Sequence, residues 1–121
     1  MIVGIGVDVV DMARFERALS RTPTLKDRLF AQREQLKDGV PRPLRSLAGR
    51  FAAKEALIKA LGDSTGVRWH DMQVVADDEG NPSFELEGAT RAIASERGIT
   101  RIHLSMSHDA GIAIAYVVAE S

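Results

Sequence analysis

Apolar segments rich in β-branched residues stand at both ends of the chain. Ile2–Val10 and Ile112–Ala119 predict strands, and the first is apolar on both sides, as a central strand would be. Arg101–Ser107 alternates apolar and polar side chains, which predicts a half-buried strand. Met72–Ala76 and Ser83–Leu86 flank a polar turn and predict a hairpin. Together these segments favour a mainly antiparallel sheet.

Helical periodicity dominates the region between the first strand and the hairpin. Asp11 is a predicted N-cap for a helix that runs to about Leu19. The strongest helical pattern runs from Leu44 to about Leu61, where Gly62 ends it. Shorter helical segments are predicted at Leu25–Phe30, Gln32–Lys37 and Ala89–Arg97. This order of elements predicts an α+β fold in a single domain over residues 1–121, with a mainly antiparallel sheet and one long helix.

The composition suits a folded domain and excludes several chemistries. The 121 residues are 45% hydrophobic and 27% charged, which is ordinary for a globular protein. The chain has no cysteine, so a disulfide framework, a zinc–thiolate site and a cysteine nucleophile are all excluded. The apolar stretches are too short to cross a bilayer, and no signal peptide opens the chain. We therefore expect a cytoplasmic protein with no membrane partner.

A basic segment lies inside a chain whose net charge is only −1. Residues 12–50 carry ten Lys and Arg against four Asp and Glu, a local charge of +6. Either these side chains simply solvate helix faces, or the segment docks an acidic partner. Arg14, Arg17 and Arg21 recur on one side of the first predicted helix and form the candidate docking face. Nucleic acid is disfavoured, because the chain is not basic overall and only 5% is aromatic.

Two carboxylates stand in apolar surroundings. Asp8 interrupts the first strand, where it needs a cation, a metal or N–H donors unless it caps the following turn. Glu55 falls within an apolar arc of the long helix formed by Leu44, Leu47, Ala48, Phe51 and Ile58. A pair with Lys59, four residues later, would account for the charge of Glu55 but not for its place on the apolar side. Two such carboxylates are typical of a Mg²⁺ site.

Three segments resemble the signature blocks of a known enzyme family. They are "GIGVDVVDMARF" near the N-terminus, "LAGRFAAKEALIKALG" in the long helix and "HLSMSHDAGIAIAYVVAE" at the C-terminus. They are similar to the holo-acyl-carrier-protein synthases, the small AcpS-type branch of the 4′-phosphopantetheinyl transferases. The resemblance implies the 4′-phosphopantetheinyl transferase fold. It also implies Mg²⁺-dependent transfer of phosphopantetheine from coenzyme A to a serine of apo acyl carrier protein, in fatty-acid biosynthesis. The second product is adenosine 3′,5′-bisphosphate.

The same resemblance assigns catalytic roles. Asp8 and Glu55 match the Mg²⁺ ligands, and Lys59 matches the lysine that contacts the reacting phosphate. In phosphoryl transfer these groups would position the pyrophosphate and neutralise the charge that develops on the leaving group. The proton of the carrier serine must pass to Glu55 or to a metal-bound water. The water is favoured, because a carboxylate bound to Mg²⁺ is a weak base.

Binding roles and assembly follow from the resemblance as well. The matching positions near coenzyme A are Arg50 and Lys54 at its phosphates and Ser107 and His108 at its nucleotide end. Arg14 matches a basic position on the helix that meets the acidic carrier protein. Family members are usually homotrimers with each active site between two subunits. The chain departs from the family at Asp109–Gly111, where many members carry a threonine and a nearby aromatic residue, so the nucleotide contacts there stay open.

Two other classes of function compete with this hypothesis. A non-catalytic adaptor could use the arginine-rich helix to bind an acidic protein, but it leaves Asp8 and Glu55 unexplained. A metal-dependent phosphohydrolase acting on nucleotides would use the same carboxylates. Mass spectrometry of an apo carrier protein incubated with coenzyme A and Mg²⁺ separates all three.

Overall fold

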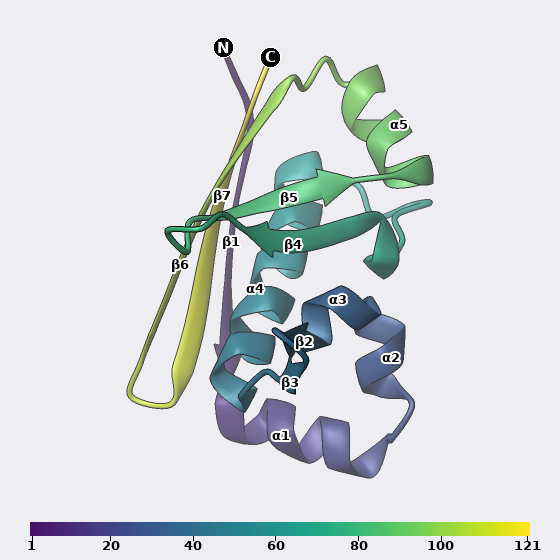
Figure 1. Cartoon of the computed structure of the whole chain (residues 1–121). Coiled ribbons are helices and arrows are strands. Elements are labelled where there is room, and N and C mark those ends of the chain that lie inside the picture. The colour runs from purple at the N-terminus through teal and green to yellow at the C-terminus, as the bar shows by residue number, and fades with distance from the viewer.

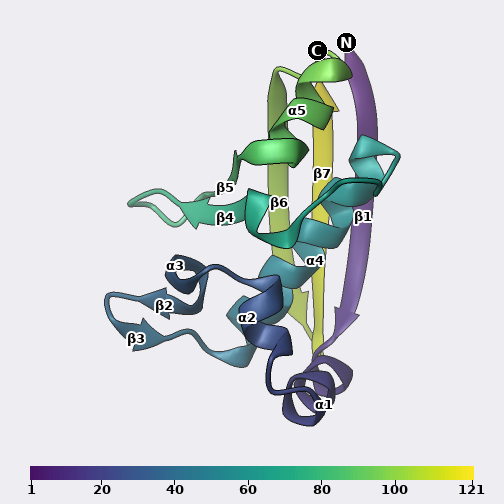
Figure 2. The same cartoon turned by 90° about the vertical axis from the view of Figure 1, so that its right-hand side faces the viewer.

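A computed structural model describes residues 1–121 and has an α+β architecture built on one antiparallel sheet. Its strand order is β1 (Ile2–Asp11), β7 (Ile112–Glu120), β6 (Arg101–Asp109). Figure 2 shows β7 between the other two strands, with both chain ends at the same end of the sheet. The predicted strands are confirmed, but the central position expected for β1 is wrong: β1 is an edge strand, because the last strand pairs with the first.

The rest of the chain lies on one side of this sheet, led by the long helix α4 (Leu44–Leu61) (Figure 1). The helix ends as predicted at Gly62, which adopts a left-handed conformation with φ 82°. Its small residues Ala52, Ala56 and Ala60 are buried, as are the residues of β7 that face it. The core therefore sits between α4 and the inner face of the sheet.

Short elements connect β1 to α4. Helix α1 (Met12–Arg21) is capped as predicted, since the Arg14 amide donates to Asp11 Oδ1 at 3.1 Å. Helices α2 (Leu25–Leu29) and α3 (Gln32–Gln35) follow. The helix expected over 32–37 ends early, because β2 (Leu36–Lys37) turns at Asp38 and Gly39 and pairs with β3 (Val40–Pro41).

A separate hairpin packs beyond α4. A 3₁₀ turn (Trp69–Asp71) leads into β4 (Met72–Ala76), which pairs with β5 (Pro82–Leu86) as predicted. Helix α5 (Gly88–Glu96) then returns the chain to β6. No helix of the chain is both long enough and apolar enough to cross a membrane.

The outer face of the sheet carries exposed apolar side chains. Strand side chains alternate, so the residues of β1 and β7 that do not face α4 point away from the whole molecule. Ile5 is 55% exposed, Val9 is 56% and Tyr116 is 51%. We call this set, which also contains Val3, Val7 and Ile112, the outer sheet face. A contiguous apolar surface of this kind is typical of a protein interface.

Candidate active site

Two glycines bring β1 into contact with α4. Gly4, Gly6 and Asp8 alternate along the inner face of the strand. A Cβ on Gly6 would lie 1.8 Å from the Ala56 carbonyl oxygen, so only glycine permits the approach. The next inward side chain, Asp8, therefore reaches the exposed side of the helix, where Glu55 stands.

Lys59 binds to β1 rather than to Glu55. Its ammonium donates to Asp8 Oδ1 at 3.1 Å and to the Val7 carbonyl at 2.9 Å. The intrahelical pair with Glu55, considered from the sequence, is not formed. The Lys59 side chain is 55% exposed while that of Asp8 is 18% exposed. The lysine charge is thus fixed beside the carboxylates and still open to a ligand from solvent.

Glu55 lies in an electrostatic setting that suits a cation. Burial raises the pKa of Glu55, the negative charge of Asp8 raises it further, and Lys59 opposes both effects. The positive charge of Lys59 therefore offsets only part of the repulsion between Asp8 and Glu55. No third Asp, Glu or His joins them, so water and phosphate oxygens would complete a coordination shell, as Mg²⁺ favours. The two carboxylates fit this hard cation.

A cavity of about 530 Å³ opens beside the two carboxylates. Its walls come from β1, α1, α2, α4 and the 3₁₀ turn, and their basic members are Arg14 and Arg28. Phe15 and Phe51 stack in its floor with ring centroids 5.1 Å apart, and Trp69 packs against Phe51. Arg28 and Trp69 were not predicted from the sequence as site residues; Arg28 belongs to the basic segment, and Trp69 is the only tryptophan.

The apolar arc of α4 that surrounds Glu55 faces two different surroundings. Leu47 and Ala48 are buried in the core as expected. Phe51 and Ile58 are only half-buried, and Phe51 lines the cavity together with Glu55. The apolar arc is therefore not buried along its whole length. Its outer part is an apolar cavity wall, and this explains why a carboxylate stands among apolar side chains.

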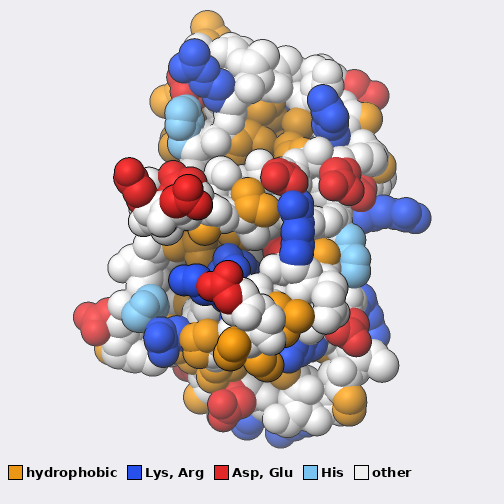
Figure 3. Space-filling model, in the orientation of Figure 1, with side chains coloured by type: hydrophobic (Ala, Val, Ile, Leu, Met, Phe, Trp, Pro, Cys, Tyr) orange, Lys and Arg blue, Asp and Glu red, His pale blue; other side chains and the backbone are white.

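A second cavity of about 380 Å³ lies near the start of α4. It contains Ser107 and His108, which the sequence predicted, together with Lys37 and Arg45, which it did not. Figure 3 shows acidic side chains around the β4–β5 hairpin, above a mixture of basic, acidic and apolar side chains over β2 and β3. Neither Asp8 nor Glu55 lines this second cavity. A single chain therefore keeps the carboxylates and the predicted nucleotide contacts apart.

Arg50 is a buried cation with an unused donor. Its guanidinium donates to Ser46 Oγ at 2.8 Å, but its Nε has no partner, and neither has the buried Nε of Arg42. Burial lowers the pKa of Arg50 to about 10, the charge of Arg42 lowers it too, and Glu34 opposes them. Ser46 also lines the second cavity. Two unsatisfied guanidinium donors this close suit an anion, which agrees with the expected role of Arg50 near phosphates.

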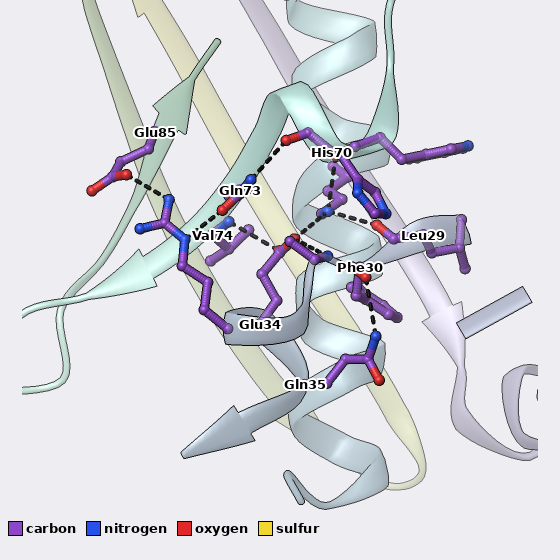
Figure 4. A network of polar contacts seen from close by, with 12 residues as sticks. Leu29, Phe30, Glu34, Gln35, His70, Gln73, Val74 and Glu85 are labelled. Atoms are coloured by element: carbon purple, nitrogen blue, oxygen red, sulfur yellow. Dashed lines mark hydrogen bonds and ion pairs between the residues drawn. The ribbon is translucent and has the colours of Figure 1, made fainter. Parts of the chain in front are cut away.

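Lys54 does not fit the role predicted for it. Its side chain is fully buried, and its ammonium donates to the Leu29 carbonyl at 2.6 Å, Glu34 Oε1 at 2.8 Å and the Trp69 carbonyl at 3.0 Å (Figure 4). Burial lowers the pKa of Lys54, although Glu34 acts in the opposite direction. All three N–H groups of Lys54 are used inside the protein. The predicted contact between Lys54 and the coenzyme A phosphates is therefore wrong, and Lys54 has a structural role instead.

The segment that departs from the family pattern is a tight turn. Asp109 and Ile112 close the β6–β7 hairpin, and Ala110 and Gly111 between them have φ values of 50° and 76°. Two positive φ values characterise a type I′ turn, which favours Asn-Gly rather than Ala-Gly. The departure therefore lies in the hairpin loop next to His108, outside the second cavity.

The candidate docking arginines are all exposed on α1. Arg14 also lines the cavity beside the carboxylates, whereas Arg17 and Arg21 lie outside it. The structure thus brings together Asp8, Glu55, Lys59 and Arg14 at one site. It places Ser107 and His108 around another, which Arg50 does not line, although Arg50 donates to Ser46 of that lining.

Comparisons with known proteins identify the family of this chain. A family model described as the 4′-phosphopantetheinyl transferase superfamily matches residues 4–117. The chain is 63% identical over 120 residues to the holo-[acyl-carrier-protein] synthase of Leifsonia xyli subsp. xyli, covering 99% of this chain and 98% of that protein. It is 55% identical over 121 residues to the synthase of Salinispora arenicola, covering 99% of each.

Solved structures share the fold. The holo-[acyl-carrier-protein] synthase from Neisseria meningitidis matches with a TM-score of 0.88 at 35% identity over 100% of both chains. The Helicobacter pylori synthase in complex with coenzyme A matches with a TM-score of 0.81 at 31% identity, over 96% of this chain and 99% of that one. The chain belongs to the 4′-phosphopantetheinyl transferase superfamily and, within it, to the holo-[acyl-carrier-protein] synthases. The fold and enzyme class implied by the three motifs are confirmed.

Proposed function

We propose that this enzyme transfers 4′-phosphopantetheine from coenzyme A to a serine of apo acyl carrier protein, in the cytoplasm and for fatty-acid biosynthesis. The observation that carries the proposal is the pair of carboxylates, Asp8 and Glu55, held beside the Lys59 ammonium at the edge of a cavity. An adaptor would not need this pair. The family and the coenzyme A-bound H. pylori relative support the choice of donor.

Asp8 and Glu55 would hold Mg²⁺, which when bound neutralises charge on the pyrophosphate. Lys59 would bind the same oxygens through the N–H that its contacts with β1 leave free. The serine oxygen forms a bond to the phosphorus that bears pantetheine while its proton passes to a base at the site, water or Glu55, and the bond to the bridging oxygen breaks. Adenosine 3′,5′-bisphosphate leaves with that electron pair. The protein contributes mainly by positioning and by fixed charge.

The nucleotide end of coenzyme A would bind the second cavity, where Lys37, Arg45 and His108 meet Ser107. The unpartnered guanidinium of Arg50 supports an anion nearby. Because one chain keeps this cavity apart from Asp8 and Glu55, we propose that a neighbouring copy completes each site in a homotrimer. The outer sheet face, with its exposed apolar side chains, supports contact between copies.

The acidic carrier protein would dock on α1. Arg14, Arg17 and Arg21 are exposed there, and Arg14 also reaches the cavity beside the carboxylates. A carrier bound on this side would present its serine close to Asp8. Complementary charge of this kind mainly steers association.

Mass spectrometry tests the activity. Apo carrier protein is incubated with the enzyme, coenzyme A and Mg²⁺, and we expect it to gain one phosphopantetheine group. An Asp8→Asn variant is the matched control and should give no gain. Hydrolysis of coenzyme A without modification of the carrier would instead indicate a phosphohydrolase. Binding without any reaction would indicate an adaptor.

Intersubunit complementation tests the shared site. Asp8→Asn disables the carboxylate pair, and His108→Ala disables the second cavity. A homotrimer of either variant alone should therefore be nearly inactive. Co-refolding the two variants should restore part of the activity, because some sites then combine two intact sets. Light scattering should show three copies in both variants. A mixture that stays inactive would place the whole site within one chain.

A further inference from the structure

We infer that the buried Lys54–Glu34 ion pair positions the α2 wall of the cavity for the carrier protein, and this inference rests on the proposed function. The pair is fully buried, with both side chains at 0% exposure and 2.8 Å between Nζ and Oε1. It lies directly beside the site in sequence, since Lys54 precedes Glu55. None of the proposed steps of the reaction uses it.

The hydrogen bonds of this pair reach four segments outside α4. The three N–H groups of Lys54 hold the end of α2 at Leu29, α3 at Glu34 and the 3₁₀ turn at Trp69. Glu34 also accepts from the Ala31 amide at 3.0 Å and the Val74 amide at 3.1 Å. Figure 4 shows these contacts converging on one point between α4, α3 and β4. Four segments are therefore tied to a single turn of α4.

Two of the tied residues form the cavity. Leu29 and Trp69 both line it, opposite the carboxylates, and Arg28 precedes Leu29 in the same wall. The other side-chain hydrogen bonds of α4 go to Ser46 within the helix and to β1. Lys54 thus makes all of the side-chain hydrogen bonds from α4 to this wall. Without it, no side chain of α4 would hold α2 beside Glu55, although His70 and Gln35 would still contact Asp27 of α2.

Stability alone does not explain such a pair. Burying two charges has a large desolvation cost, and well-packed apolar residues of similar volume are often as stabilising. An apolar side chain, however, cannot bind the two carbonyl groups that Lys54 holds. The pair therefore fixes the positions of Leu29 and Trp69 relative to α4, which apolar packing alone would not determine. Its effect should appear in recognition of the carrier, which meets the α1–α2 side, more than in coenzyme A binding.

The test removes both charges at once, in the double variant Lys54→Met with Glu34→Gln. A single Lys54→Met change would leave a buried, unpaired carboxylate and could unfold the chain. The matched control is Arg33→Met with Glu85→Gln, which removes the exposed ion pair between α3 and β5 at 2.5 Å. Arg33 neighbours Glu34 on the same helix, so the control perturbs the same segment without touching the cavity.

Two readouts separate positioning from folding. In steady-state kinetics we expect the double variant to raise KM for the carrier protein about tenfold, below the ~100-fold that a 1 Å misplacement of reacting atoms can cost. KM for coenzyme A should stay within about twofold. Trp69 is the only tryptophan and packs on Phe51, so its fluorescence reports on the wall directly. Its emission should shift to longer wavelength in the double variant and stay unchanged in the control.

The opposite results overturn the inference. A merely structural pair would lower the melting temperature and the active fraction, and leave both KM values and Trp69 emission unchanged. If the double variant does not fold, Lys54→Gln with Glu34→Gln decides, because it also removes both charges and keeps a side-chain donor and an acceptor. It should then raise KM for the carrier about twofold with the same spectral shift, and unchanged values would refute the inference. Trp69 fluorescence remains informative even if the wild-type enzyme transfers nothing, an outcome that would refute the proposed function instead.

Discussion

Replacing Gly6 with alanine tests whether the close approach of β1 to α4 builds the site. The added Cβ would lie 1.8 Å from the Ala56 carbonyl oxygen, and 3.0 Å is the shortest separation that real Cβ atoms show. The strand must move away from the helix by at least 1.2 Å. The obstacle is helix backbone, so no side-chain rotation can relieve it.

This displacement has a worked consequence at the site. If the whole shift separates Lys59 Nζ from Asp8 Oδ1, their distance rises from 3.1 Å to about 4.3 Å, which is too long for a hydrogen bond. Misplacement of a reacting centre by 1 Å can cost about 100-fold in rate, so we expect transfer to fall by about that factor. Overpacking should also lower the free energy of unfolding by about 1–3 kcal/mol.

Transfer kinetics and thermal unfolding, each with and without Mg²⁺, measure both effects. Gly49→Ala is the control for stability, because its Cβ would meet only the flexible end of Met106 at 2.8 Å, and alanine favours a helix. The control should unfold at or above the wild-type temperature. A Gly6→Ala enzyme with wild-type activity and melting temperature would refute the argument that this contact positions Asp8.

Four further predictions concern single residues. Burial and Asp8 raise the pKa of Glu55 in the folded protein above its value in the unfolded chain. Between these two pKa values the unfolded chain has already lost the proton that the folded protein still holds. The free energy of unfolding of the metal-free protein should therefore fall as pH rises through this range. The rise in melting temperature caused by Mg²⁺ should grow over the same pH range, and Glu55→Gln should abolish both trends together with transfer. Lys59→Ala should lower kcat about 100-fold in steady-state kinetics, with a smaller change in KM for coenzyme A. If kcat stays normal, Lys59 serves only to hold β1 and has no part in the reaction. Arg14→Glu should raise KM for the carrier protein about tenfold at low salt and leave KM for coenzyme A unchanged, and wild-type activity at low carrier concentration should fall as salt rises through about 0.1 M. Ala110→Asn should raise the free energy of unfolding by about 1 kcal/mol, measured by urea titration, because asparagine tolerates a positive φ better than alanine does.

Local patterns predicted the elements well because period and caps are properties of the segment itself. The extent of α4, the cap at Asp11 and the β4–β5 hairpin could all be obtained from neighbouring residues. The edge position of β1 could not, because it depends on a strand more than a hundred residues later. Apolar residues on both sides of β1 indicated burial, and the structure leaves its outer side exposed for a partner.

The site was predictable where a residue conflicted with its local pattern. Asp8 and Glu55 interrupt apolar runs, and that conflict can be seen in the sequence alone. Lys54 also lies on a buried face of α4, but its partner Glu34 comes from a short helix whose placement no periodicity reveals. Lys37 and Arg45 were hidden among many basic residues. Which members of a charged segment gather around one cavity is decided by tertiary packing.

The pairing of β1 with β7 links the site to the order of synthesis. Asp8 lies opposite Ala115, so its strand acquires a partner only when β7 is available. Contacts of such long sequence separation form late and slow folding, because a large loop must close first. Residues 112–120 leave the ribosome after all the other elements of the fold. Until then the apolar β1 has two unpaired edges, which is the state most prone to aggregation. The strand that carries Asp8 is therefore paired only after β7 has been made.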